Sequence, residues 1–128
     1  MSLEKSKVQP TEGELQILKV IWELGPSTVR KVNECLSVNK DVGYTTTLKQ
    51  MQIMFEKGLL NRRKEGKHHI YISEISREDT QTQVVNKILD TLFQGSAMKL
   101  VMHALGNRPS SPEELEEIRN YLNSLKEK

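Results

Sequence analysis

Residues 43–73 read GYTTTLKQMQIMFEKGLLNRRKEGKHHIYIS, and their hydrophobic period changes partway along. The first half places apolar residues at helical spacing and predicts a helix from about Thr45 to Lys57. Gly58 follows it and can adopt the left-handed conformation that favours a helix exit. In the second half, apolar and polar residues alternate on either side of Glu65-Gly66-Lys67, which indicates two strands joined by a turn. The segment therefore predicts a helix followed directly by a β-hairpin.

Two shorter helices are expected before this segment. Thr11 stands three residues before Glu14, the spacing of a reciprocal cap at a helix start, and apolar residues follow at helical spacing. Gly25-Pro26 should end that helix. Ser27 is then expected to cap a second helix that fades near Val38.

The pattern becomes helical again after Ser76 and stays so to the end of the chain. Helices are expected from Ser76 to Gly95, from Ala97 to Leu105 with Gly106 as the stop, and from Ser111, which caps a helix opening on Pro112. The expected fold class is mainly α with a small β-hairpin. We expect two domains, over residues 1–75 and over residues 76–128.

Composition excludes several classes of function. The 128 residues allow one ordinary domain or two small ones, and a formal net charge of +2 names no partner by itself. There is no glycine-rich phosphate loop and no zinc-binding helix motif, so no catalytic residue, metal site or cofactor is expected. His68 and His69 should point to opposite faces of a strand, and the single Cys35 should be a half-buried structural thiol.

The chain is expected to be cytoplasmic. One cysteine cannot form an internal disulfide, residues 1–10 lack the apolar centre of an export signal, and no stretch approaches the roughly 20 apolar residues of a membrane span. Membrane insertion is therefore not expected.

The distribution of charge points to nucleic acid. Residues 1–75 contain 12 Lys and Arg against 9 Asp and Glu, whereas residues 76–128 contain 7 against 8. Half of the 12 basic residues fall on the third helix and the hairpin, which is the expected electrostatic footprint for a phosphate backbone. These six residues are Lys49, Lys57, Arg62, Arg63, Lys64 and Lys67.

The third helix has a polar face suited to reading bases. At about 100° per residue, one side gathers Thr47, Leu48, Met51, Met54, Phe55 and Gly58 and should pack inward. The opposite side gathers Thr45, Thr46, Lys49, Gln52, Ile53 and Glu56, and Gln50 lies at the flank. Hydroxyl, ammonium and amide groups can contact base edges and phosphates. A third helix with this face, followed by a basic hairpin, predicts a winged helix-turn-helix.

Four segments carry a resemblance to a known family: Leu15–Trp22, Gly43–Leu48, Glu56–Leu60 and His69–Tyr71. Together they resemble the penicillinase-repressor group, which includes the methicillin-resistance and copper-transport repressors. The resemblance implies a homodimeric bacterial repressor whose N-terminal winged helix binds palindromic double-stranded operator DNA. By position it places Thr45, Thr46 and Lys49 at the major groove, and Arg62, Arg63 and Lys67 at phosphates or the minor groove. The full set of expected DNA-binding residues is Tyr44, Thr45, Thr46, Lys49, Gln50, Gln52, Arg62, Arg63 and Lys67.

The chain departs from the family pattern in three places. No cysteine lies beyond Cys35, which argues against copper sensing of the kind that uses clustered C-terminal cysteines. The Asn-Phe pair cleaved in β-lactam-responsive members through a membrane sensor protease system is absent from the equivalent stretch, Leu100–Leu105, so release by proteolysis stays a hypothesis. Ile53 stands near the position of a usual arginine, which bears on operator preference.

The C-terminal helices carry more apolar surface than so few residues can bury internally. A second copy of the chain should cover it, and the expected dimerisation residues are Val84, Ile88, Leu92, Leu100, Val101, Leu105, Leu115, Ile118, Leu122 and Leu125. The preferred interpretation is a dimeric repressor of a resistance or transport operon. The alternative is a winged-helix module that binds a protein partner, since a fold does not determine its function. An enzyme ranks third.

Overall fold

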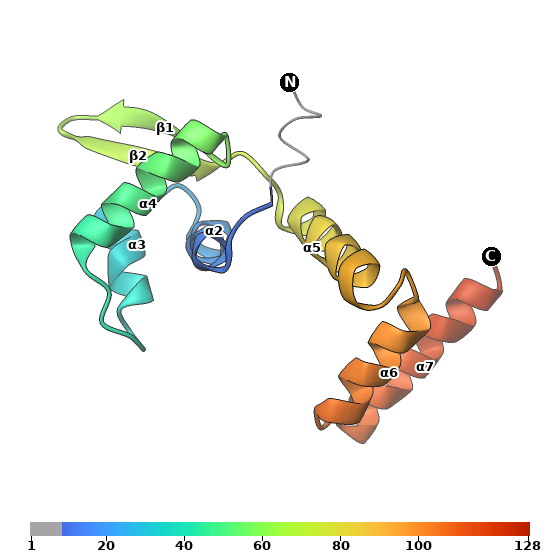
Figure 1. Cartoon of the computed structure of the whole chain (residues 1–128). Helices are drawn as coiled ribbons and strands as arrows, with labels where there is room; N and C mark the ends of the chain where they lie inside the picture. The colour runs from blue at the N-terminus through green and yellow to red at the C-terminus, as the bar shows by residue number, and fades with distance from the viewer. Residues whose placement is uncertain (1–8) are drawn as a thin grey trace. The chain divides into compact units, whose positions relative to one another are not determined.

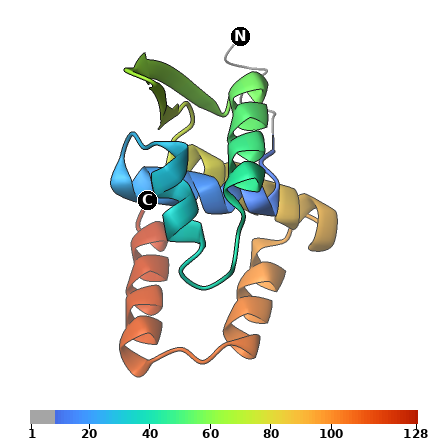
Figure 2. The same ribbon diagram turned by 90° about the vertical axis from the view of Figure 1, so that its left-hand side faces the viewer.

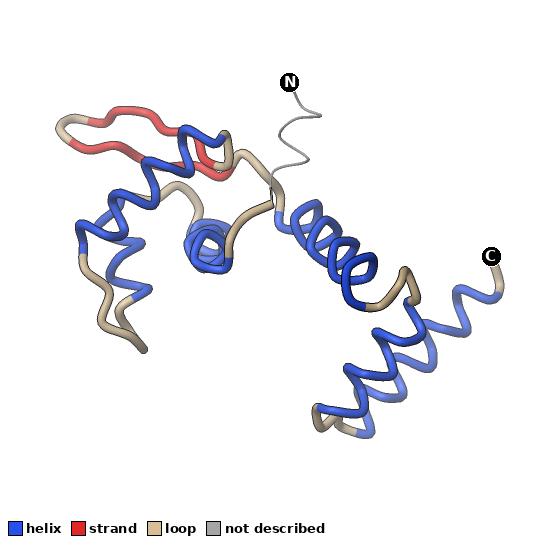
Figure 3. Tube along the Cα trace, viewed as in Figure 1, coloured by secondary structure: helices blue, strands red, loops and turns tan. Residues whose placement is uncertain are grey.

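The computed structural model describes residues 9–128, and within that range it contains six helices and two strands (Figure 3). The expectation about an export signal in residues 1–10 falls mostly on residues 1–8, which lie outside the described range. The elements, in chain order, are α2 (Glu12–Leu24), α3 (Val29–Leu36), α4 (Tyr44–Lys57), β1 (Leu60–Glu65), β2 (His68–Ser73), α5 (Arg77–Leu92), α6 (Ala97–Asn107) and α7 (Pro112–Lys126). The predicted fold class, mainly α with a small hairpin, is confirmed.

The two strands form one antiparallel hairpin (Figure 1). Its register pairs Leu60 with Ser73 at the open end and Glu65 with His68 at the turn. Gly66, at φ 60°, occupies the turn that the sequence predicted there. The strand Leu60–Glu65 follows α4 after only two residues, and Gly58 at φ 85° makes that sharp exit possible because it has no side chain to clash.

The helix starts agree with the sequence except at α3. Thr11 and Glu14 form the reciprocal cap of α2, and Ser111 caps α7. Thr28, not the predicted Ser27, caps α3: its hydroxyl oxygen accepts from the Lys31 backbone N–H at 3.1 Å. Ser27 instead exchanges two backbone hydrogen bonds with Tyr71 of β2, at 2.8 and 3.0 Å, so it is occupied as a strand partner and buried.

Gly106 does not stop α6, as the sequence had suggested. The helix continues to Asn107, since a glycine inside a helix costs only about 1 kcal/mol relative to alanine. It ends because Arg108 precedes Pro109, and the residue before a proline is pushed out of the helical region. Arg108 is accordingly extended, at φ −130° and ψ 136°.

One hydrophobic core lies among α2, α3, α4 and the hairpin. Apolar residues of all three helices and both strands are buried in it, and the side chains with the least exposure are Ile17, Leu18, Val32, Met51, Met54, Leu59, Leu60 and Tyr71. Helix α2 packs against α3, α4 and β2, and α4 also packs against α3 and β1. This core holds α4 with one face inward.

The chain divides into two compact units, residues 1–85 and 86–128, which meet within α5. The boundary expected from the sequence lay ten residues earlier, at the end of the hairpin. In the second unit no residue of α6 or α7 is buried, and Figure 2 shows these two helices separated from each other. None of the helices in residues 9–128 has the length and apolar character required to cross a membrane.

Candidate nucleic-acid interface

Helix α4 presents a polar face to solvent. Thr45, Thr46, Lys49 and Gln52 are exposed, while Thr47, Met51 and Met54 on the opposite side are buried. The inward and outward faces predicted for this helix are therefore confirmed. Tyr44, at the first position, is half exposed, and Ile53 remains 39% exposed, which is unusual for an isoleucine. The exposed face carries the groups that can read base edges.

A buried polar network fixes the start of α4 against α3. The Asn33 side-chain amide donates to the Thr47 hydroxyl at 2.9 Å and to the Val42 carbonyl at 2.8 Å. Thr47 is fully buried, so these bonds are shielded from water and leave none of its polar atoms unpaired. The Ser37 hydroxyl also donates to Val42, at 3.2 Å. The turn between α3 and α4 is thus fixed by hydrogen bonds from Asn33 and Ser37 to the Val42 carbonyl, and Asn33 also bonds to Thr47 of α4.

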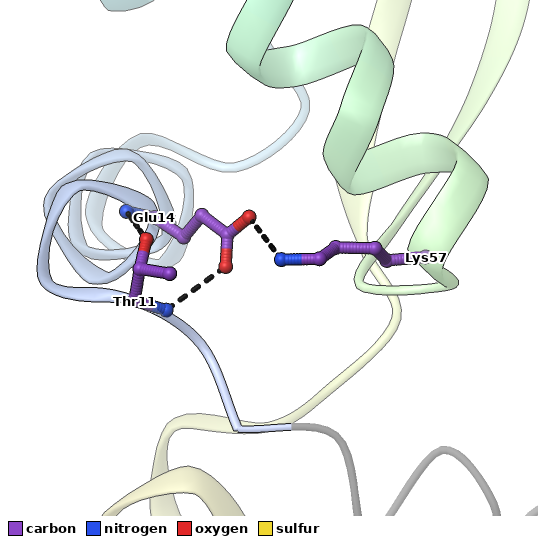
Figure 4. A network of polar contacts seen from close by, with 3 residues as sticks. All are labelled: Thr11, Glu14 and Lys57. Atoms are coloured by element: carbon purple, nitrogen blue, oxygen red, sulfur yellow. Dashed lines mark hydrogen bonds and ion pairs between the residues drawn. The ribbon is translucent and has the colours of Figure 1, made fainter.

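A second network fixes the end of α4 against α2 (Figure 4). Lys57 Nζ donates to Glu14 Oε2 at 2.7 Å, and the other oxygen, Oε1, accepts from the Thr11 backbone N–H at 2.9 Å. The Glu14 side chain is only 6% exposed, so its charge depends on these partners. The same carboxylate therefore caps α2 and anchors the last residue of α4.

Gln50 faces α2 rather than solvent. It is half-buried, and its amide nitrogen lies 2.8 Å from the point where a Cβ on Gly13 would stand. A side chain at position 13 would require the end of the Gln50 side chain to shift. Among the residues expected to bind DNA, Gln50 is thus placed against the neighbouring helix.

The basic residues of the hairpin divide between two faces of β1. The Arg62 guanidinium lies 4.0 Å from the centre of the Phe55 ring and makes a long hydrogen bond to the Tyr71 hydroxyl, at 3.4 Å. Arg63 points the other way, into solvent, where its Nε lies 3.0 Å from Glu65. Lys64 and Lys67 are exposed as well. Arg62 thus connects the hairpin to α4, and Arg63 is accessible to a ligand from solvent.

A groove of about 760 Å³ lies between α3, α4 and the hairpin. Its walls bring together side chains that are far apart in the sequence, including two expected DNA-binding residues on α4, Tyr44 and Gln52, and Lys67 at the hairpin turn. Among its lining residues in the described chain, Glu34 is the single acid. The other walls are Thr28, Val29, Arg30, Asn33, Leu48, His68, His69 and Tyr71.

Sequence analysis missed several residues of this groove. Arg30 was overlooked because it stands outside the basic cluster, yet α3 places it on the groove wall. The histidine pair was interpreted as a solvated hairpin edge rather than a metal site; His68 and His69 are indeed exposed, and the structure adds that they line the groove beside Lys67. The sequence signal that could have found Arg30 is its position two residues after Thr28, at the start of a helix facing the hairpin.

The second unit has unburied apolar residues instead of a polar site. Of the ten residues expected at a dimer interface, all but Val84 lie in this unit. Val84, Leu100 and Ile118 are half-buried and the others are exposed, from 36% at Ile88 to 69% at Leu92. Met98, Met102 and Tyr121 add further exposed apolar surface to α6 and α7. Many apolar side chains of this unit are therefore in contact with water in the single chain.

Three helices packed on a hairpin, with a polar exposed third helix beside a basic groove, define a winged helix-turn-helix protein. The Penicillinase repressor family model matches residues 10–124, and the chain belongs to the penicillinase repressor family. It is accordingly a transcriptional repressor and not an enzyme. This confirms the family resemblance seen in the sequence.

Named relatives agree over nearly the whole chain. It is 22% identical over 121 residues to the methicillin resistance regulatory protein MecI of Staphylococcus aureus, covering 94% of this chain and 98% of MecI. It is 27% identical over 118 residues to the penicillinase repressor of Bacillus licheniformis, covering 92% of each. Among solved structures, reduced AbfR bound to DNA aligns with a TM-score of 0.46 and 19% identity, over 88% of this chain and 74% of that one.

Proposed function

We propose that this repressor binds palindromic operator DNA as a homodimer, with α4 in the major groove and the hairpin beside it. The observation that carries the proposal is the groove between α4 and the hairpin, because it sets base-reading groups next to basic ones. Thr45, Thr46, Lys49 and Gln52 would face the bases, and Arg63 and Lys67 would meet phosphates. Tyr44, at the groove edge, would contact the backbone.

Arg30 extends the proposed interface. It lines the same groove from α3, opposite Lys67, so a phosphodiester strand passing between α4 and the hairpin would have a cation on each side. Arg62 supports the interface indirectly, through its contact with Phe55 of α4. Gln50 is turned to Gly13 and would act by holding α4 on α2.

The domains and the dimer belong to the same proposal. Residues 1–75 would bind DNA and residues 76–128 would dimerise, which supplies the missing cover for the apolar faces of α6 and α7. Two half-sites bound by linked units gain affinity because the second binding event becomes intramolecular. Separation of the C-terminal helices would then release the operator.

We extend the proposal to regulation. The names of the relatives, which concern methicillin resistance and penicillinase, support control of a resistance operon. Control of a transport operon is the other form of this proposal, and in both the repressor would act in the cytoplasm. A membrane sensor protease system is one route to release. The stretch Leu100–Leu105 lies in α6, where no residue is buried, so cleavage there would remove the proposed dimer surface.

Selection of bound duplexes from a random pool, followed by gel shift and sedimentation, tests this function. The expected result is enrichment of an inverted repeat bound by two chains, with affinity that falls as salt rises. Recovery of no preferred sequence, together with a salt-independent interaction, would instead support the protein-interaction module.

A further inference from the structure

The connection between the hairpin and α5 is short and is held by several hydrogen bonds. Three residues separate Ser73, the end of β2, from Arg77, the start of α5. The Glu74 backbone N–H donates to the Leu59 carbonyl at 2.9 Å, and the Ile75 N–H donates to the Ser73 hydroxyl oxygen at 3.2 Å. We call residues 73–77 the joint. Its backbone is held in place, unlike that of a flexible linker.

Trp22 of α2 ties both ends of the joint to the first unit. Its indole N–H donates to the Ser73 hydroxyl oxygen at 3.1 Å and to the Ile75 carbonyl at 3.0 Å. The Arg77 guanidinium lies 5.6 Å from the centre of the same ring, within the range of a cation–π contact. One side chain thus contacts the strand end, the middle of the joint and the first residue of α5.

The first turns of α5 are fixed as well. The Ser76 hydroxyl oxygen accepts from the Asp79 N–H at 3.0 Å and caps the helix. Thr80 is 2% exposed, and its hydroxyl donates to the Ser76 carbonyl at 2.7 Å. Helix α5 then runs without interruption to Leu92, although the first unit ends at Val85. Since a continuous helix bends only gently, the joint sets the direction of the first turns of α5 within the first unit.

We infer that Trp22 is a positioning residue that restricts the operator to one separation of its half-sites. The inference rests on the proposed function, since it requires a dimer held through the C-terminal helices. Each base pair inserted between half-sites rotates one of them by about 35° around the duplex. A stiff joint would prevent the DNA-binding unit from following the rotated half-site, whereas a flexible joint would allow it to follow.

Two variants weaken the joint and one serves as a control. Trp22→Phe keeps an aromatic ring in place and removes the indole N–H. Ser73→Ala removes the hydroxyl that accepts from both Trp22 and Ile75. Val20→Ala, at a half-buried position of the same helix that packs against the core, loses packing without touching the joint. The probes are the selected operator, the same duplex with two base pairs inserted at its centre, and a single half-site.

We expect wild type and Val20→Ala to prefer the selected operator over the lengthened one by about tenfold or more. Trp22→Phe and Ser73→Ala should reduce that preference to about threefold or less, with half-site affinity within about twofold of wild type. A wild-type spacing preference in both variants would overturn the inference. Should Trp22→Phe fail to fold, Ser73→Ala decides the matter.

Hydrogen exchange separates this inference from the proposed function, because it needs no DNA. In Trp22→Phe, the amides of Ile75 and Asp79 should exchange about tenfold faster than in wild type, while those of α4 stay unchanged. Unchanged exchange at the joint overturns the role of Trp22 even if the protein is a repressor as proposed. Absence of any operator for the wild-type chain refutes the proposed function, and the spacing inference falls with it, whatever the exchange shows.

Discussion

Arg62 and Arg63 are neighbours in sequence but perform different tasks in the structure. Successive side chains of a strand point to opposite faces, so one guanidinium lies on the Phe55 ring and the other lies in solvent. The ion pair between Arg63 and Glu65 is exposed and weak, so Arg63 can exchange Glu65 for a phosphate. A basic run in a sequence is thus a mixture of structural and accessible charges.

Replacing the two arginines separately should distinguish these tasks. Arg63→Ala should reduce the slope of log affinity against log salt by about 0.9, the value for one lost phosphate contact. Arg62→Ala should leave the slope unchanged and lower the free energy of unfolding by about 0.5 to 2 kcal/mol, since the cation–π contact is lost. Salt titrations of DNA binding and urea unfolding measure the two effects.

Lys87→Ala, on the exposed side of α5, is the matched control for charge. It should change neither the salt slope of DNA binding nor the free energy of unfolding. A reduced slope for Arg62→Ala with an unchanged one for Arg63→Ala would reverse the assignment of the two residues.

Glu14 illustrates how a buried charge depends on one partner. Lys57→Met should lower the free energy of unfolding by about 1 to 3 kcal/mol, because it leaves the Glu14 carboxylate without its cation. Glu14→Gln keeps a side-chain oxygen for the cap of α2 and removes the charge, so Lys57→Met should cost much less in that background. Urea unfolding of the four proteins measures the coupling.

Lys49→Met, on the exposed face of the same helix, controls for loss of a lysine. Additive effects of the Glu14 and Lys57 changes would show that the contact contributes nothing to stability.

At the scale of an element, α4 is held at its two ends by two different helices. The Asn33 network attaches its start to α3, and Glu14 attaches its end to α2. Because these contacts use Thr47 and Lys57, the exposed residues Thr45, Thr46, Lys49 and Gln52 take no part in them. This separation allows the outward residues to vary with operator sequence while the fold stays the same.

Thr46→Ala and Lys49→Ala should each reduce the preference of the protein for operator over random DNA. A good base contact contributes roughly 1 to 3 kcal/mol of discrimination. Glu56→Ala, at the far end of the same exposed face, should leave the preference unchanged. Competition gel shifts measure the ratio, and wild-type preference in both of the first two variants would place the reading surface elsewhere.

The groove is a property of several elements together. Arg30→Ala combined with Lys67→Ala should reduce the salt slope by about 1.8, with equal loss of affinity for all sequences, since phosphate contacts carry no sequence information. Each single variant should reduce the salt slope by about half of that amount. A slope equal to that of wild type in the double variant would show that no phosphate lies in the groove.

At the scale of the whole molecule, the second unit is incomplete as a single chain. None of its residues is buried, and apolar side chains of α6 and α7 are exposed to water. Monomeric proteins rarely leave large areas of apolar surface uncovered. A second copy presenting the same surface would supply the burial that this unit lacks.

Ile118→Asp should convert the dimer to monomer and lower operator affinity by orders of magnitude, because an unpaired charge would be buried at a cost of several kcal/mol. The first unit, which has its own core, should keep its stability. Analytical ultracentrifugation and gel shifts measure the two effects.

Asn120→Asp adds the same charge two positions further along α7, and it should leave the dimer intact. A dimeric Ile118→Asp variant, or a monomer that binds the operator as tightly as wild type, would contradict this mechanism.

The sequence by itself determined the elements and the faces of α4. Hydrophobic period, caps such as Thr11 and Ser111, and the glycine exit at Gly58 are local signals, read within a few residues of where they act. The family resemblance could also be recognised from the sequence, because each of its four segments is continuous in the chain. For these reasons the fold class and the outward residues of α4 were predictable.

Only the tertiary structure decided which partner each long side chain meets. Arg62 lies on Phe55, Gln50 on Gly13, Ser27 beside Tyr71 and Trp22 on the joint. The last two contacts join residues more than 40 positions apart, and several rotamers of each side chain would satisfy the local pattern equally well. Packing of α2, α3 and the hairpin around α4 selects among them, so the residues that hold the candidate interface in place emerge only when the core is assembled.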